Sequence, residues 1–232
     1  MTDRIVTALA LAILLILGFG SSSAIAQEAT LLPAFKGGVR RDAILKDPQA
    51  IISISSACYA AIPANGGNSA GATQQCIIDK LKAIGASAQA IAFAHFAPVP
   101  SAIEYYKQYR NAAAVYALMR WADGASGWCL IGASGEAIGM WEPTGAEHDP
   151  KFAGFARVHP NAALWMPIDR DDAPKVITIA GGAEWLIMPF KVKDCHACAI
   201  IGDAQVGFDF DRSGRYRGAV LMNISTAPSN SQ

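Results

Sequence analysis

The sequence predicts an α+β fold in which a helical N-terminal half is followed by an antiparallel β-sheet with a disulfide-closed loop. Apolar residues at helical spacing occur between residues 49 and 111. Later in the chain, short segments with alternating apolar residues are separated by glycine-containing turns, a pattern typical of antiparallel strands. Cys195 and Cys198 lie between two of these later segments.

The composition excludes two broad classes of protein. The chain has 232 residues, with 19 Lys and Arg side chains against 19 Asp and Glu side chains, so its formal net charge is zero. Because there is no basic excess to neutralise phosphates, we expect no nucleic-acid partner. Hydrophobic residues make up 52% of the chain and charged residues 16%, which is too apolar for an intrinsically disordered protein.

Residues 1–26 have the three parts of a secretory signal peptide. Arg4 supplies the positive n-region, residues 5–19 form a nearly unbroken apolar run, and Ala24-Ile25-Ala26 supplies a small-residue cleavage site. A membrane anchor is the alternative, but the run is shorter than the about 20 residues that a bilayer requires. We therefore expect a periplasmic or secreted protein with no membrane span after cleavage.

The region after the signal peptide is predicted to be an arm followed by helices. Residues 27–48 indicate an extended arm over the domain surface, and residues 49–145 a helical region with a first hairpin. Ile77, Leu81 and Ile84 recur at the i, i+4, i+7 spacing of one helix face. These positions predict a helix with one apolar face.

Further segments complete this region. Ser101-Ala102-Ile103-Glu104 matches the S-x-x-E capping box, which predicts that a helix begins there. After about residue 112 the pattern changes to strands, with Ala114–Trp121 first. Gly127–Gly132 and Glu136–Trp141 then form the first hairpin, and the polar, turn-rich residues 142–149 mark a boundary between two halves.

Residues 146–225 are predicted to form the antiparallel sheet. Lys175–Ala180 and Ala183–Val192 flank Gly181-Gly182, which favours a tight hairpin because glycine adopts positive φ readily. Pro189 lacks an amide donor and therefore predicts a sheet edge or a bulge.

A short helix precedes these strands, and a second hairpin follows the cysteine pair. Lys151–His159 is the predicted helix. Gln205–Asp211 and Tyr216–Ile224 are the strands of the hairpin, and Arg212-Ser213-Gly214 is its turn. Residues 226–232 are polar and are predicted to form a flexible tail.

All five cysteines lie after the signal peptide, and an exported compartment permits disulfides. Because five is odd, at most two intrachain bridges form, and fifteen arrangements leave one thiol free. The preferred pairs are Cys58–Cys76, which would join two helical segments across a glycine-rich loop, and Cys195–Cys198. Cys129 is then the free thiol, and its apolar strand Trp128–Ile131 indicates that it is buried.

The Cys195-x-x-Cys198 pattern occurs in several kinds of site, each with its own neighbours. Redox catalysis favours a helix N-terminus at the first cysteine, whereas strands are predicted on both sides here. A c-type haem needs His directly after the second cysteine, where Ala199 stands, and zinc needs two further ligands that the sequence does not supply. The favoured interpretation is a structural disulfide that stiffens the connection between the strands.

Other motifs for metal binding and catalysis are incomplete. Asp209–Gly214 matches the opening of a calcium loop, but Val220 stands where a bidentate Glu is required. A hairpin turn with Asp211 accepting turn amides is therefore favoured. Gly132–Glu136 lacks the last glycine of the G-x-S-x-G nucleophile motif. We expect no catalytic residue, no metal site and no cofactor, and hence a protein that is not an enzyme.

The order of features from about Asp149 to Ile224 resembles the inhibitor of vertebrate lysozyme family of Gram-negative periplasms. The shared order is a short helix, an apolar segment with Trp165, a β-hairpin, a disulfide-closed loop carrying a histidine, and a second hairpin. In that family the loop protrudes and inserts its histidine into the lysozyme active-site cleft. The resemblance implies the same role for His196. The partner-binding residues that it implies are Asp194, Cys195, His196, Ala197 and Cys198.

The resemblance implies an exported, non-enzymatic binding protein whose partner is a lysozyme-type glycosidase. The loop has fewer residues between its cysteines than the loop of the family, and residues 27–145 lie outside the resemblance. Two other functions stay open. One is an envelope interaction or structural module with an unknown partner, and the other is a thiol-disulfide oxidoreductase that uses Cys195 and Cys198.

Overall fold

The computed structural model describes most of the chain between residues 29 and 227. The described residues are 29–61, 69–96, 100–119, 126–139, 145–167, 169–195 and 197–227. Some sequence predictions lie outside the described residues: the signal peptide, residues 142–144 of the boundary segment, His196 and residues 228–232 of the tail.

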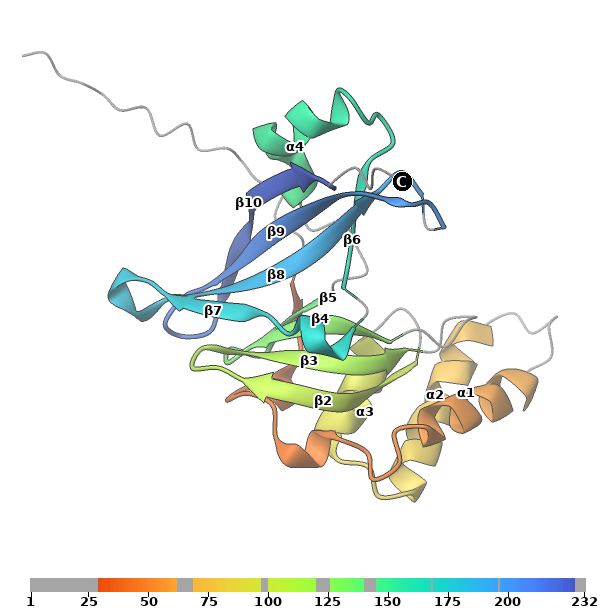
Figure 1. Cartoon of the computed structure of the whole chain (residues 1–232). Coiled ribbons are helices and arrows are strands. Elements are labelled where there is room, and N and C mark those ends of the chain that lie inside the picture. The colour runs from red at the N-terminus through yellow and green to blue at the C-terminus, as the bar shows by residue number, and fades with distance from the viewer. Residues whose placement is uncertain are drawn as a thin grey trace, which may run out of the picture.

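The described chain forms a group of helices and two sheets (Figure 1). The α-helices are α1 (Ala50–Ala61), α2 (Ser69–Ala83), α3 (Ala88–Phe96) and α4 (Pro150–Ala156). Short 3-10 helices are η1 (Pro33–Phe35), η2 (Arg41–Ala43), η3 (Ala146–His148), η4 (Arg170–Asp172) and η5 (Ala180–Gly182). The strands are β1 (Thr30–Leu31), β2 (Ser101–Gln108), β3 (Ala112–Met119), β4 (Ser126–Gly132), β5 (Glu136–Gly139), β6 (Ala163–Trp165), β7 (Lys175–Thr178), β8 (Glu184–Lys193), β9 (Ile200–Phe210) and β10 (Tyr216–Thr226).

The first sheet has the strand order β1-β5-β4-β3-β2, and its paired neighbours are antiparallel. In its centre, Val115 of β3 lies opposite Cys129 of β4. Both residues are buried in one cluster with Phe35 and Phe93, which come from η1 and α3. The segment that the sequence predicted as an extended arm over the surface therefore contributes core residues to this side of the sheet.

A disulfide bond joins helices α1 and α2, as the sequence predicted. It links Cys58 to Cys76, and Cys58 is fully buried. Ile77 and Leu81 are buried in the same cluster, which confirms their predicted helix face. The prediction for Ile84 is wrong: α2 ends at Ala83, and Ile84 is 56% exposed.

The second sheet has the strand order β10-β9-β8-β6, and β7 pairs with another part of β8. Gly181 and Gly182 lie in the connection from β7 to β8, and their φ angles of 82° and 80° are positive, as predicted for this hairpin turn. Pro189 lies between the part of β8 that pairs with β7 and the part that pairs with β6. Its missing amide donor therefore falls at a local sheet edge, one of the two positions predicted for it.

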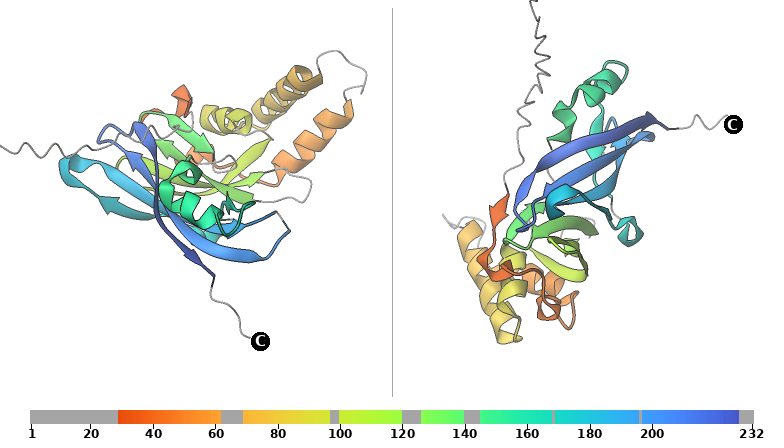
Figure 2. Two further views of the ribbon diagram at one scale, coloured as in Figure 1. Left: turned by 90° about the horizontal axis from the view of Figure 1, so that it is seen from above. Right: turned by 90° about the vertical axis from the view of Figure 1, so that its left-hand side faces the viewer.

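The two sheets stack on one another and share a hydrophobic core (Figure 2). Trp128 and Leu130 of the first sheet are buried in the same cluster as Leu186 and Phe208 of the second sheet. Phe152 of α4 is buried there too. The first sheet thus lies between helices on one face and the second sheet on the other.

The helix that the capping box at Ser101–Glu104 predicts is not present. These residues begin β2, which pairs with β3 from Ser101 to Gln108 with one register shift between Ile103 and Tyr105. Tyr105 and Tyr106 favour a strand, and pairing with β3 outweighs the four-residue capping signal. The α+β class holds for the described chain, but its strands form two antiparallel sheets, where the sequence predicted a first hairpin and one sheet.

Candidate functional site

The disulfide bond between Cys195 and Cys198 closes the turn from β8 to β9. Lys193 and Ile200 are the last paired residues before this turn. Inside it, the amide of Cys198 donates a hydrogen bond to the carbonyl oxygen of Cys195 at 3.2 Å. We call residues 194–199 the tip. It lies at the end of the second sheet opposite the β7–β8 turn (Figure 1).

The tip is exposed to solvent. Asp194, Cys195 and Ala197 are exposed, and Cys198 is half-buried. His196 lies outside the described residues. The other four residues that the resemblance implied for partner binding therefore share one exposed, covalently closed turn.

Three strands hold the base of the tip. Lys193 lies opposite Ile200 of β9 and Ala163 of β6. The indole Nε1 of Trp165 donates a hydrogen bond to the carbonyl oxygen of Lys193 at 3.4 Å. The tip therefore starts from a backbone position that is fixed on both sides.

The charges beside the tip are mixed in sign. The Lys191 ammonium forms an ion pair with Asp203, with a nitrogen–oxygen distance of 2.7 Å. Lys193 and Asp194 carry opposite charges and are adjacent in the chain. Attraction to an acidic cleft would therefore depend on short-range hydrogen bonds rather than on long-range steering by lysines.

The surroundings of this disulfide differ from those of a typical redox centre. The bond lies between two strands, whereas a catalytic cysteine is commonly activated at a helix N-terminus. Cys129 is the free, buried cysteine that the sequence predicted. Burial raises the pKa of the Cys129 thiol far above its ordinary value, so this thiol stays protonated and unreactive at neutral pH.

Among the described residues, no group of three or more His, Cys, Asp or Glu side chains is placed to hold a metal ion. The segment that matched the opening of a calcium loop is the β9–β10 turn. Asp211 accepts hydrogen bonds from the amides of Ser213 and Arg215 at 2.8 and 3.0 Å, as predicted for a turn. The hydroxyl of Ser213 also donates to Asp211, and this bond is the main cause that lowers the pKa of the Asp211 carboxyl.

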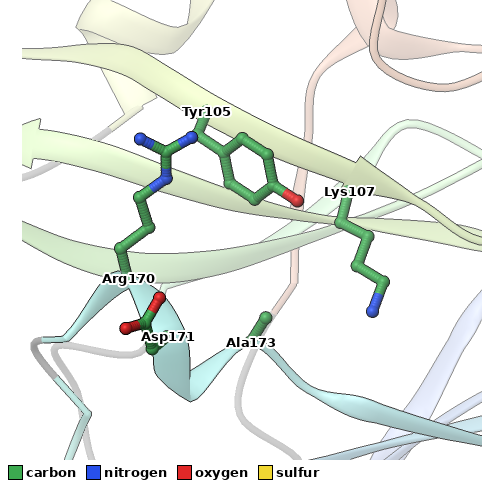
Figure 3. Close-up of a pocket in the computed structure, with 5 residues that line it drawn as sticks. All are labelled: Tyr105, Lys107, Arg170, Asp171 and Ala173. Carbon is green, nitrogen blue, oxygen red and sulfur yellow. The ribbon is translucent and has the colours of Figure 1, made fainter.

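A second candidate site is a cleft with a volume of about 480 Å³. It lies between β2 and η4, which belong to different halves of the chain (Figure 3). The guanidinium carbon of Arg170 lies 4.4 Å from the centre of the Tyr105 ring. The lining residues are Tyr105, Lys107, Arg170, Asp171 and Ala173.

Sequence reasoning missed this cleft. Tyr105 and Lys107 fall in the segment predicted as a helix, and no motif joins that segment to Arg170. A weak signal existed, because the aromatic pair Tyr105-Tyr106 favours a strand over a helix. The meeting of β2 with η4 depends on how the two sheets stack, which no local pattern reports.

The chain was compared with protein-family models, curated proteins and solved structures, and none of them matches. In the part of the chain that the structure describes, no helix is both long and apolar enough to span a bilayer. The case for a function therefore depends on the tip, on the cleft and on the sequence pattern.

Proposed function

We propose that this chain is an exported, non-enzymatic binding protein that inhibits a lysozyme-type glycosidase by inserting His196 into the active-site cleft of that enzyme. The observation that carries the proposal is the exposed, disulfide-closed tip at the end of a paired hairpin. The signal-peptide pattern of residues 1–26 supports a partner outside the cytoplasm.

A histidine suits such a cleft because lysozyme-type glycosidases hold two carboxyl groups beside the bond that they cleave. A neutral imidazole donates a hydrogen bond from one ring nitrogen and accepts one at the other, whereas a protonated imidazole donates from both. An imidazole between one protonated and one ionised carboxyl group therefore finds a partner on each side. The bound ring would then occupy the space that the sugar substrate needs.

The closed turn lowers the entropic cost of this insertion. The bond between Cys195 and Cys198 restricts the backbone before any partner arrives, so less conformational freedom is lost on binding. Ile200 is 44% exposed directly after the tip and offers an apolar contact to the rim of a cleft.

The proposal is tested by measuring the rate at which a lysozyme degrades bacterial cell walls as this protein is added. The wild-type protein is expected to lower the rate, and His196→Ala to remove most of the inhibition. His148→Ala is the matched control, because His148 is an exposed histidine on η3 rather than at the tip. An unchanged rate with micromolar wild-type protein, or full inhibition by His196→Ala, rejects the proposal.

The two disulfides provide a second pair of variants. Cys195→Ser combined with Cys198→Ser opens the tip and is expected to weaken inhibition. Cys58→Ala combined with Cys76→Ala removes the bond between α1 and α2 and is expected to leave inhibition unchanged. An equal loss of inhibition in both double variants would assign the effect to overall stability and contradict a specific role for the tip.

A further inference from the structure

We propose that the cleft between β2 and η4 binds a small organic carboxylate that also carries a hydrogen-bond donor, such as an acidic sugar or an amino acid. This inference is independent of the proposed lysozyme contact, because no residue of the tip lines the cleft. The volume of about 480 Å³ falls within the range of small-molecule sites, which is about 300–1,000 Å³.

The wall formed by η4 is fixed to the first sheet on both sides of the cleft residues. Before η4, the indole Nε1 of the buried Trp128 donates to the carbonyl oxygen of Asp169 at 2.9 Å. After η4, the Tyr109 hydroxyl donates to the carbonyl oxygen of Pro174 at 2.5 Å. Burial, with a smaller effect of the neighbouring Tyr105, raises the pKa of Tyr109 to about 12, so this hydroxyl keeps its proton at neutral pH. The cleft is therefore built before a ligand arrives.

Two cations of the cleft are available to an anion. Lys107 and Arg170 stand on either side of Ala173 (Figure 3). Lys107 lies over the ring of Tyr109 at 5.3 Å, and Arg170 lies over the ring of Tyr105 at 4.4 Å. Neither side chain forms an ion pair with another described residue. Both charges are thus held by aromatic rings without being neutralised, and a carboxylate can accept hydrogen bonds from them.

Asp171 determines which kind of anion the cleft favours. Among the described residues, two positive side chains and one negative side chain line the cleft, and their charges sum to one positive charge. That balance suits a singly charged carboxylate better than a phosphate, because Asp171 repels the larger negative charge of phosphate more strongly. A hydroxyl or ammonium group on the ligand can instead donate to the Asp171 carboxylate. These requirements together describe a carboxylate that carries a donor group.

The rings behind Arg170 fix its position. The Tyr105 and Trp128 rings meet edge to face, with centroids 6.4 Å apart. Trp128 is fully buried, so Tyr105 packs on a rigid neighbour. An Arg guanidinium that already lies over a fixed ring loses little side-chain freedom when it binds a carboxylate.

The test is a titration of the full chain that is monitored by two-dimensional NMR of backbone amides. The probes are D-glucuronate and L-alanine, and the matched controls are D-glucose, acetate and inorganic phosphate. At least one probe is expected to shift the amides of Tyr105, Lys107 and Arg170 and to bind at least about tenfold more tightly than each control, as expected for one charge-assisted hydrogen bond. The probe that binds identifies the source of the carboxylate.

Charge-removing variants locate the contacts. Arg170→Gln and Lys107→Gln are each expected to weaken binding of the responding probe about tenfold. Asp171→Asn is expected to weaken binding of the same probe but to strengthen binding of acetate, because the neutral Asn oxygen is a weaker acceptor than a carboxylate and does not repel an anion. Lys175→Gln, an exposed lysine on β7 outside the cleft lining, is the control and should bind as wild type does.

Three results would overturn the inference. One is the absence of cleft-residue shifts with both probes. Another is phosphate binding as tightly as the better probe. The third is an unchanged affinity for the probe in Arg170→Gln and Lys107→Gln, provided that both variants keep the urea unfolding midpoint of the wild-type protein. None of these results depends on whether the protein inhibits lysozyme.

Discussion

The two ends of the second sheet are held in different ways. At one end, the turns of the second sheet press against the turns of the first sheet. Gly214 of the β9–β10 turn lies so close to the β2–β3 and β4–β5 turns that an added Cβ would stand 2.4 Å from Asn111 O and from Ala133 N. The Ser134 hydroxyl donates to the carbonyl oxygen of Gly214 at 2.8 Å. We call this the clamped end.

The opposite end, which carries the tip, has its own covalent closure in place of such contacts. Asp194, Cys195 and Ala197 are exposed, and the disulfide to Cys198 closes the turn. The disulfide limits the backbone freedom that an exposed turn otherwise retains. Order at the clamped end therefore comes from packing, whereas order at the tip comes from a bond that leaves the surface free for a partner.

The largest expected effect on the free energy of unfolding comes from a substitution at the clamped end. Gly214→Ala places a methyl group against Asn111 and Ala133 at a φ of 78°, so we expect a loss of about 2–5 kcal/mol in the free energy of unfolding from strain and overpacking together. Gly181→Ala is the matched control. Its φ is 82° but nothing lies within 4 Å of the added methyl, so about 1–2 kcal/mol of backbone strain is expected. Urea unfolding measures both, and equal losses would contradict the close packing.

The next effect concerns a buried hydrogen bond at the same end. Glu184 is 4% exposed, and its carboxylate accepts a hydrogen bond from the backbone amide of Asn111 at 2.7 Å. Glu184→Ala leaves that amide without its acceptor, and we expect a loss of about 1–3 kcal/mol in the free energy of unfolding. Glu184→Gln keeps an oxygen acceptor and should lose less. Urea unfolding measures both variants. If Glu184→Gln lowers the free energy of unfolding as much as Glu184→Ala does, the hydrogen bond is not the cause of the loss.

The third effect is that of removing the disulfide of the tip, which tests whether the tip is ordered independently of the clamped end. Cys195 and Cys198 are three residues apart, so the loop that they close is small, and its removal is expected to lower the free energy of unfolding by at most about 2 kcal/mol. Amide hydrogen exchange should increase at the tip in the Cys195→Ser, Cys198→Ser variant and stay unchanged at the β9–β10 turn. Faster exchange over the whole second sheet would mean that the tip disulfide supports the fold and not only its own turn.

The smallest effect is a pH dependence at the clamped end. Hydrogen bonds, first from the Ser213 hydroxyl, lower the pKa of Asp211 in the folded protein. A lowered folded pKa stabilises the protein above the unfolded pKa, and this stability is lost as the pH falls through the folded pKa. Asp211→Asn should therefore cost less than about 1 kcal/mol at neutral pH, because Asp211 is partly exposed and its partners Ser213 and Arg215 are exposed, and still less in acid. Urea unfolding of the wild type and of Asp211→Asn at neutral and acidic pH measures this cost. A cost that is larger in acid than at neutral pH would contradict the prediction.

Local patterns predicted the second sheet better than the first. Gly181-Gly182 and the Cys195–Cys198 pair are turn and cross-link signals that act within a few residues, and the structure contains both features. The strand at Ser101 was missed because its capping-box letters fit a helix, while its pairing with β3 is not visible locally. The cleft was missed for the same reason, since Tyr105 and Arg170 meet only after the sheets stack.

The most direct test of the tip as the binding element is amide hydrogen exchange measured with and without excess lysozyme. Our account predicts new protection in peptides covering residues 193–200 and no change in peptides covering the β9–β10 turn at 211–215. Protection of the β9–β10 turn with none at the tip, or no protection anywhere, would contradict the account.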